Sequence, residues 1–206
     1  MKKILHLIAT PRGEDSRTLK VSTYFLSEIC KKYPKCEIDE FNVFSEELPE
    51  LTVKRVEGKY FLLGGKDMPE DVRISWNEIV KQIDRFMSAD TVVISAPMWN
   101  FSIPYRLKQY IDVIVQPKYL FRYTDKGVEG LAKGKEMVVV TSRGGDYGGG
   151  NPSDHQESYL RTVFEFIGIK DITFINVQPM DAMGPEVQAK KTEEAKKIAG
   201  ELAGKM

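Results

Sequence analysis

The sequence predicts an α/β fold, in which five parallel strands form a doubly wound sheet with helices on both faces. Short apolar runs of strand length alternate with segments whose apolar residues recur at helical spacing. This alternation indicates a parallel sheet with right-handed crossovers. The chain has 206 residues, 42% of them hydrophobic, so it can bury one sizeable core as a single domain, 1–206. We expect the strand order 2-1-3-4-5, which is common for five such strands.

The elements follow in order along the chain. The predicted strands are 3–9, 36–44, 91–95, 136–141 and 172–177, and charges within 36–44 indicate an edge strand. Ser16 is the expected N-cap of the first helix. The apolar stripes of the five helices are Leu19, Thr23, Leu26, Cys30 and Tyr33; Trp76, Ile79, Val80, Ile83, Phe86 and Met87; Leu107, Tyr110, Ile111 and Ile114; Leu160, Val163, Phe164 and Ile167; and Ala195, Ile198, Ala199 and Leu202.

Two insertions are expected in this domain. Segments 45–73 and 117–135 are longer than ordinary connections, which indicates a functional or interfacial role. In the second segment Tyr119, Phe121 and Tyr123 alternate, which would place three aromatic rings on one side of an extended strand. Such rings outside the main sheet favour a partner surface, and a second copy of the chain is the expected partner.

Composition argues against several classes of function. Lysine and arginine total 30, as do aspartate and glutamate, so the charge balance does not indicate binding to nucleic acid or to an anionic membrane. The apolar run 4–9 is too short for a signal peptide, and no run reaches membrane-spanning length. Cys30 and Cys36 are too few for a disulfide framework or a zinc site, and we expect both to stay reduced in a cytoplasmic protein.

The loop after the third strand carries the most specific signal. The strand ends at Pro97, and Met98-Trp99-Asn100-Phe101 follows ahead of a helix. Ligand sites of open α/β sheets form just beyond the carboxyl ends of the strands. Met98, Trp99 and Phe101 would be ordinary core residues in the simplest interpretation. Three of them around an amide, on a loop, favour a flat amphipathic ring instead, and a flavin fits best.

The loop after the first strand is a candidate phosphate site. Thr10, Ser16 and Thr18 bring hydroxyls to the start of a helix, and Arg12 and Arg17 add positive charge. Backbone N–H groups and the dipole at a helix start bind anions. The alternative is that these hydroxyls only cap the helix. The segment is neither a P-loop, since Gly-Lys-Ser/Thr is missing, nor a dinucleotide fingerprint, since G-x-G-x-x-G is missing.

The loop after the fourth strand is rich in glycine. Ser142-Arg143-Gly144-Gly145 is followed by three more glycines within 146–151. Glycine lets a backbone approach a planar ligand closely, although a flexible spacer is the alternative. In the order 2-1-3-4-5, strands 1, 3 and 4 are neighbours, so the three loops are expected to meet at one point of the sheet edge.

These motifs resemble the flavodoxin-like NAD(P)H-quinone reductases, and more specifically the FMN-dependent NADH-azoreductases. The resemblance rests on segments 96–104, 121–131, 141–145 and 166–169 and covers nearly the whole chain. It implies a flavodoxin-like fold and a homodimer with one FMN per subunit at the dimer interface, reducing quinones and azo compounds in two half-reactions. NADH or NADPH would donate hydride to flavin N5, so no catalytic side chain and no metal are expected.

The resemblance also implies site residues. The FMN-binding residues would be Thr10, Ser16, Arg17 and Thr18 for the phosphate, and Pro97, Met98, Trp99, Asn100, Phe101, Ser142, Arg143, Gly144 and Gly145 around the ring. In the expected dimer, Phe121 would reach toward the substrate pocket beside Trp99 and Asn100. Thr10, Arg17 and Trp99 stand where the family more often has Ser, Gln and Tyr, which leaves the substrate preference open.

Two alternatives use the same topology. A flavodoxin-like electron carrier would bind FMN without a small-molecule substrate of its own, but such carriers present a strongly acidic face and this chain is neutral. A receiver-type signalling module needs acidic residues at the ends of strands 1 and 3, where Ala9-Thr10 and Ala96-Pro97 stand. Of the two histidines, His6 in the first strand is expected to be structural. His155 is expected to lie on the surface at a helix start, and the alternative is that it lines the pocket.

Overall fold

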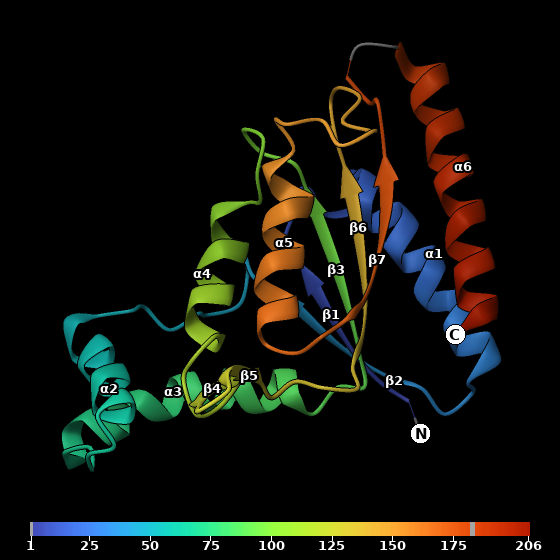
Figure 1. The fold of residues 1–206 in the computed structure, drawn as a ribbon. Coiled ribbons are helices and arrows are strands. Elements are labelled where there is room, and N and C mark those ends of the chain that lie inside the picture. The colour runs from blue at the N-terminus through green and yellow to red at the C-terminus, as the bar shows by residue number, and fades with distance from the viewer. Residues whose placement is uncertain (1, 182–183) are drawn as a thin grey trace.

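The computed structural model describes residues 2–181 and 184–206. At its centre is a parallel sheet in the order β2-β1-β3-β6-β7 (Figure 1). The strands are β1 (Lys3–Ile8), β2 (Glu37–Asn42), β3 (Thr91–Pro97), β6 (Glu136–Ser142) and β7 (Asp171–Val177). The predicted parallel sheet of five strands is confirmed. The numbering 2-1-3-4-5 does not carry over, because β4 and β5 intervene in the sequence and form a sheet of their own.

Helices cover both faces of the sheet. On one face α1 (Arg17–Lys32) and α6 (Gly184–Lys205) pack against each other, and α3 (Glu70–Met87), α4 (Tyr105–Ile114) and α5 (His155–Phe166) cover the other (Figure 1). Successive side chains of β3 point to opposite faces of the sheet. Val93 packs toward α1, whereas Val92 and Ile94 pack toward α3, α4 and α5. This burial on both faces explains the continuous apolar run of β3. Among the described residues, no helix is both long and apolar enough to cross a bilayer.

The buried face of α1 differs from the predicted stripe. The helix buries Val21, Phe25 and Ile29 together with Leu26, whereas Thr23 of the predicted stripe is exposed. Ser16 is the N-cap, as predicted, and its Oγ accepts from the Leu19 N–H. Both stripes have helical spacing, so the spacing does not choose between them. The observed face buries the larger apolar side chains and therefore removes more apolar surface from water.

The two insertions have secondary structure of their own. Segment 45–73 contains α2 (Val53–Leu63) and the start of α3, on which α2 packs. Segment 117–135 contains the antiparallel hairpin of β4 (Phe121–Thr124) and β5 (Gly127–Gly130). The hairpin lies against the end of α5 so closely that a Cβ atom at Gly130 would overlap the Ile167 carbonyl carbon, and only glycine fits there.

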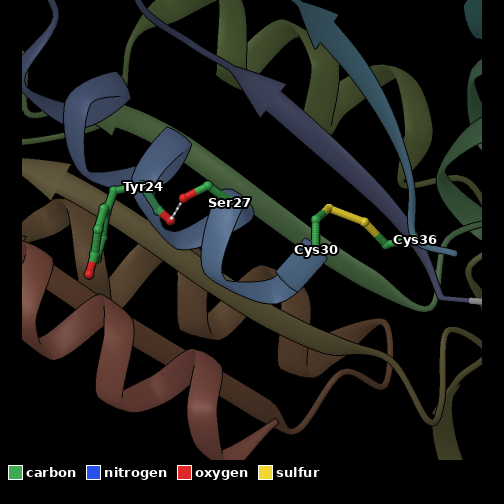
Figure 2. The surroundings of a disulfide bond; sticks show 4 residues. All are labelled: Tyr24, Ser27, Cys30 and Cys36. Carbon is green, nitrogen blue, oxygen red and sulfur yellow. Dashed lines mark hydrogen bonds between the residues drawn. A yellow bond between two sulfur atoms is a disulfide. The ribbon is translucent and has the colours of Figure 1, made fainter. Parts of the chain in front are cut away.

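Cys30 and Cys36 form a disulfide (Figure 2), so the expectation that both stay reduced is wrong. α1 ends at Lys32, and the Cys36 N–H donates to the Tyr33 carbonyl at 2.8 Å, which turns the chain back into β2. The turn brings the two cysteine Cα atoms to 5.7 Å, within the usual range for a disulfide. The cysteine spacing alone does not reveal this turn.

His6 is buried in β1 and belongs to a chain of hydrogen bonds. Ser22 Oγ donates to the Leu19 carbonyl and accepts from Ser95 Oγ at 2.7 Å, so the remaining contact, His6 Nε2 to Ser95 Oγ at 2.8 Å, has the imidazole as donor. Nδ1 therefore carries no proton in the neutral ring and faces Glu40 at 3.5 Å. Burial lowers the pKa of His6, and Glu40 offsets this only in part.

We predict that His6 makes the fold sensitive to mild acid. In the unfolded chain this imidazole takes up a proton near pH 6.5, whereas in the fold it does so only at lower pH. The unfolded state therefore binds more protons between these two values, and the free energy of unfolding falls as pH drops through that window, by up to about 1.4 kcal/mol per pH unit. Urea unfolding from pH 8 to pH 5 should show a weaker pH dependence for His6→Gln. Equal slopes in the two proteins would contradict the prediction.

Candidate functional site

A cavity of about 210 Å³ lies at the carboxyl end of the sheet, where the arrowheads of β3, β6 and β7 point (Figure 1). It is lined by the loops that follow β1, β3 and β6, together with one residue that follows β7. The cavity brings together ten of the residues singled out in the sequence: Thr10, Arg12, Ser16, Arg17, Pro97, Met98, Trp99, Ser142, Arg143 and Gly144. Its remaining lining residue is Asp181.

The β1 side of the cavity is the start of α1. Thr10 and Ser16 are buried there, and Ser16 Oγ lies 2.9 Å from Thr18 Oγ1 behind it. Ser16 therefore both caps the helix and lines the cavity, while Thr18 supports it without lining the cavity. The first turn of α1 contains no acidic residue, and Arg12 and Arg17 stand at its entrance. This combination of hydroxyls, helix dipole and cations favours an anion.

Asp181 closes one side of this anion site, and sequence reasoning missed it. Its Oδ1 lies 2.6 Å from Arg17 Nη1. The N–H groups of Met180 and Asp181 both donate to the Gly144 carbonyl, which ties the exit of β7 to the exit of β6. A Cβ atom at Gly144 would lie 2.5 Å from Asp181 Oδ2, so a larger residue at this position would displace the Asp181 carboxylate. Only a recognisable binding motif after β7 could have indicated Asp181, and the sequence has no such motif there.

The β3 loop forms a tight turn. Trp99 and Ser102 exchange backbone hydrogen bonds of 2.9 and 3.0 Å, and the residues between them, Asn100 and Phe101, have φ values of +47° and +70°. Asparagine tolerates this left-handed conformation, whereas phenylalanine is strained by about 1–3 kcal/mol. The His155 N–H holds the turn by donating to the Phe101 carbonyl at 3.0 Å. The Phe101 side chain is 53% exposed, and neither turn residue lines the 210 Å³ cavity.

Aromatic side chains surround Trp99. Phe44, from the loop after β2, lies 5.7 Å from Trp99 between ring centroids, and Tyr105, the first residue of α4, lies 6.5 Å away. Trp99 also lines a second hollow of about 480 Å³ with Asn100, Tyr105 and Tyr159. Trp99 therefore separates the 210 Å³ cavity from the 480 Å³ hollow and lines both. Neither Phe44 nor Tyr105 belongs to a motif that marks it in the sequence, although Tyr105 directly follows Ile103-Pro104.

Arg143 contributes its backbone to the cavity, but its guanidinium is buried beneath the loop at 1% exposure. Nη1 pairs with Asp154 at 2.8 Å, and Nε donates to Gln156 Oε1 at 3.3 Å. Gln156 Nε2 in turn donates to the Ala96 carbonyl at the end of β3 at 3.1 Å. Asp154 also caps α5 by accepting from the N–H groups of Gln156 and Glu157. The Arg143 side chain therefore positions the strand ends rather than facing a ligand.

The glycine-rich loop folds against the exit of β7. Gln178 Nε2 donates to Asp146 Oδ1 at 3.0 Å, and the Tyr147 N–H donates to Gln178 Oε1 at 3.3 Å. The Tyr147 ring lies 6.4 Å from the Phe101 ring, so the loop approaches the β3 turn. Gly145 does not line the cavity, and His155 is exposed at the start of α5, as expected.

Phe121 lies at the other end of the molecule. The β4–β5 hairpin is near the amino-terminal ends of the sheet strands, opposite the cavity (Figure 1). Phe121 is buried against Phe166 at 4.8 Å, while Tyr123 is exposed and Tyr119 packs on the core. Tyr119 lies in the turn 118–120 before β4, so the three aromatics do not form one extended run, although the Phe121 and Tyr123 rings share a side of β4 with 5.8 Å between their centroids.

Comparisons with known proteins agree on a family. The profile of a family described as having a flavodoxin-like fold matches residues 2–202. An FMN-dependent NADH:quinone oxidoreductase of Nitratidesulfovibrio vulgaris is 36% identical over 98% of this chain and 99% of its own. A protein of the same name from Rhizobium meliloti is 40% identical over 97% and 96%.

A solved structure supports the same assignment. An FMN-dependent NADH-azoreductase from Bacillus anthracis, in complex with FMN, superimposes with a TM-score of 0.84 at 28% identity, over 98% of this chain and all of that one. A second azoreductase structure from that species gives a TM-score of 0.85 at 27% identity, with the same coverage. The family profile spans almost the entire chain, and the relatives match it from end to end. The chain therefore belongs to the flavodoxin-like family that includes the FMN-dependent NADH:quinone oxidoreductases.

Proposed function

We propose that this chain is an FMN-dependent NAD(P)H oxidoreductase that reduces quinones and azo compounds in two half-reactions. The nucleotide and then the acceptor would bind in turn at the same site beside the flavin. One observation carries the proposal. A helix start bearing hydroxyls and arginine meets the Met98–Trp99 loop in a single cavity at the strand ends. The names of the relatives support FMN as cofactor, NADH as donor, and quinones or azo compounds as acceptors.

The start of α1 fits the phosphate of FMN. Thr10 and Ser16 offer hydroxyls, the backbone offers the free N–H groups of a helix start, and Arg17 offers a cation. Asp181 already pairs with Arg17, and its carboxylate would compete with a phosphate for the same guanidinium. Phosphate binding would therefore turn Asp181 away from Arg17.

The β3 and β6 loops fit the isoalloxazine ring. Met98 and Trp99 offer flat apolar contact, but their N–H groups already donate to Ser142 and Ser102. Hydrogen bonds to the polar edge of the ring would therefore come from the backbone of Gly144, which lines the cavity. Where the ring extends beyond the cavity, Gly145 and the Asn100 amide, which lines the adjoining hollow, would add to them. Glycine permits the close approach that this requires.

The protein's part in the reaction is to bind and orient. When bound, FMN supplies the two-electron chemistry. The described residues that line the cavity include no histidine and no cysteine, and their one carboxylate, Asp181, is paired with Arg17. The buried contacts of Arg143 fix the loops that follow β3 and β6 relative to each other. Binding and orientation are what a reductase of this type requires of its side chains.

We also propose a homodimer that completes the site. The cavity is smaller than the roughly 300 Å³ of pockets that enclose a ligand, so it would leave part of the ring uncovered. At the opposite end, Val128 and Phe166 line a broad hollow of about 1210 Å³, with Tyr123 exposed and Phe121 packed beneath Phe166. In a two-fold dimer this hairpin end of one copy would cover the cavity of the other.

We predict that the purified protein is yellow and releases FMN when it is denatured. NADH or NADPH should bleach the flavin absorbance in the absence of an acceptor, and a quinone added afterwards should restore it. Chromatography of the released flavin identifies the cofactor, and stopped-flow mixing separates the two half-reactions. Release of FAD, or no flavin binding after reconstitution with excess FMN, would overturn the proposal.

We predict that changing Ser16 and Thr18 together to alanine weakens FMN binding at least tenfold. A hydrogen bond to a charged group is worth about 1.5–3 kcal/mol, and about 1.4 kcal/mol corresponds to a tenfold change in Kd. Fluorescence titration of the folded apoprotein with FMN measures the change. Thr52→Ala is the matched control, because Thr52 caps α2 by accepting from the Arg55 N–H and does not line the cavity. Equal FMN affinity in all three proteins would leave Ser16 as a helix cap only.

We predict a dimer at micromolar concentration, by sedimentation velocity. Changing Tyr123 and Val128 together to aspartate should produce monomers and lower quinone turnover at saturating FMN, since charges would replace exposed apolar groups at the hairpin. Ile198→Asp, on the exposed side of α6, is the control that should remain dimeric and active. A wild-type monomer with full turnover would refute the dimer while leaving the FMN proposal intact.

A further inference from the structure

The loop between the two bonded cysteines holds the end of α6. Lys32, the last residue of α1, donates from Nζ to the Gly204 carbonyl at 2.8 Å, and Tyr33 donates from its hydroxyl to the Met206 carbonyl at 2.7 Å. The last carbonyls of a helix have no partner within that helix, and α6 ends at Lys205. Two neighbouring side chains at the end of α1 therefore cap the end of α6 from outside.

The position of Tyr33 depends on the turn that follows α1. Its N–H closes the helix by donating to the Ile29 carbonyl at 2.8 Å, and its own backbone leaves the helical conformation, with φ −118° and ψ 83°. The side chain packs on the same apolar layer as Leu202 and Met206 of the α6 end. A change in the turn 33–36 would therefore move both the ring and the hydroxyl that caps α6.

The disulfide closes this turn. Cys30 lies in the last part of α1 and Cys36 lies just ahead of β2, six positions later (Figure 2). Within the turn the Cys36 N–H donates to the Tyr33 carbonyl, and the disulfide ties Cys36 back to the helix. A disulfide across so short a loop constrains the unfolded chain less than one across a long loop, which leaves the turn itself as the place where the bond acts.

The bond is placed where a small thiol can reach it. Both cysteines are half-buried rather than enclosed in the core, and they lie at the amino end of the sheet, away from the 210 Å³ cavity. Exchange between a thiol and a disulfide begins with attack of a thiolate on one sulfur and requires such access. Accessible disulfides are in general the labile ones.

We propose that Cys30 and Cys36 form a redox-sensitive switch, in which the disulfide docks the end of α6 and its reduction releases that end. The reductant is a small thiol of the glutathione class. Its thiolate attacks one cysteine sulfur and forms a mixed disulfide, while the other cysteine leaves and takes up a proton. A second small thiol then displaces the first cysteine, which is protonated in turn. Two small thiols thus become one small disulfide, and the inference does not depend on the flavin.

Counting thiols tests the exchange. The purified chain is equilibrated with mixtures of reduced and oxidised glutathione and trapped with N-ethylmaleimide, and its mass is measured. We expect no label in oxidised glutathione and a label on each of the two cysteines in reduced glutathione. Two labels in every mixture would show that the bond does not form, and no label in excess reduced glutathione would show that it does not open. Either result would overturn the proposal.

Hydrogen exchange, read by mass spectrometry, tests the release of α6. Backbone amides in 199–206 should exchange at least about threefold faster in the reduced protein than in the oxidised protein, because the hydrogen bonds that cap the helix end are weakened. α5 lies on the other face of the sheet and is the internal reference that should not change (Figure 1). Equal exchange of 199–206 in the two states contradicts the switch.

Two tyrosine variants separate the capping hydrogen bond from the disulfide. Tyr33→Phe keeps both cysteines but loses the bond to the Met206 carbonyl, so its oxidised form should already exchange faster than oxidised wild type at 199–206. Tyr24→Phe is the matched control and should exchange like wild type. Tyr24 also lies on α1 and approaches α6, where a Cβ atom at Gly200 would be 3.4 Å from its hydroxyl oxygen, but it lies away from the end of α6 (Figure 2).

Oxidised Tyr33→Phe that exchanges like wild type would show that the loop does not hold α6, and this would overturn the proposal. The comparison of oxidised with reduced wild type needs no variant, so it decides the matter even where Tyr33→Phe fails to fold.

Discussion

The buried guanidinium of Arg143 is the interaction on which the carboxyl edge of the sheet depends. A buried charge is unfavourable unless it is paired and hydrogen-bonded, and Arg143 meets this requirement at Nη1 through Asp154 and at Nε through Gln156, both at the start of α5. Gln156 in turn donates a hydrogen bond to the Ala96 carbonyl of β3. The exits of β3 and β6 are thus fixed to one helix start. Removal of any one member would leave a charge or an amide buried without its partner.

The same helix start also stabilises a strained turn. The His155 N–H is one of the donors that the first turn of α5 cannot use internally, and it holds the Phe101 carbonyl. The β3 turn can therefore keep a phenylalanine in the left-handed conformation, which projects the side chain outward at 53% exposure. Strain of this kind persists where the surroundings determine the conformation, and it gathers at functional sites. Its position next to the Met98–Trp99 loop is consistent with the proposed role of that loop.

Local sequence signals predicted the sheet, its covering helices and the three loops, because each depends on a pattern within a few residues. What they missed depends on contacts between distant segments. Asp181 meets Arg17 only through the tertiary fold, and nothing near Arg143 shows that its side chain turns inward. The Cys30–Cys36 bond depends on the geometry of one turn. The buried face of α1 was misplaced because two faces share the same spacing, and only the sheet beneath decides between them.

The carboxyl and amino ends of the sheet carry different stabilising interactions. The carboxyl end carries the charge network, the strained turn and the proposed cofactor site, whereas the disulfide lies where α1 runs into β2 at the amino end (Figure 2). Cys30 comes 14 residues after Ser16 along α1, so about 21 Å of helix separates the disulfide from the anion site. Reduction of this bond would loosen the junction of α1 with the edge strand β2. The exits of β3 and β6 would keep their geometry, because α5 holds them independently of α1. The cysteines therefore bear on the stability of the edge strand, whereas the geometry of the cavity rests on α5.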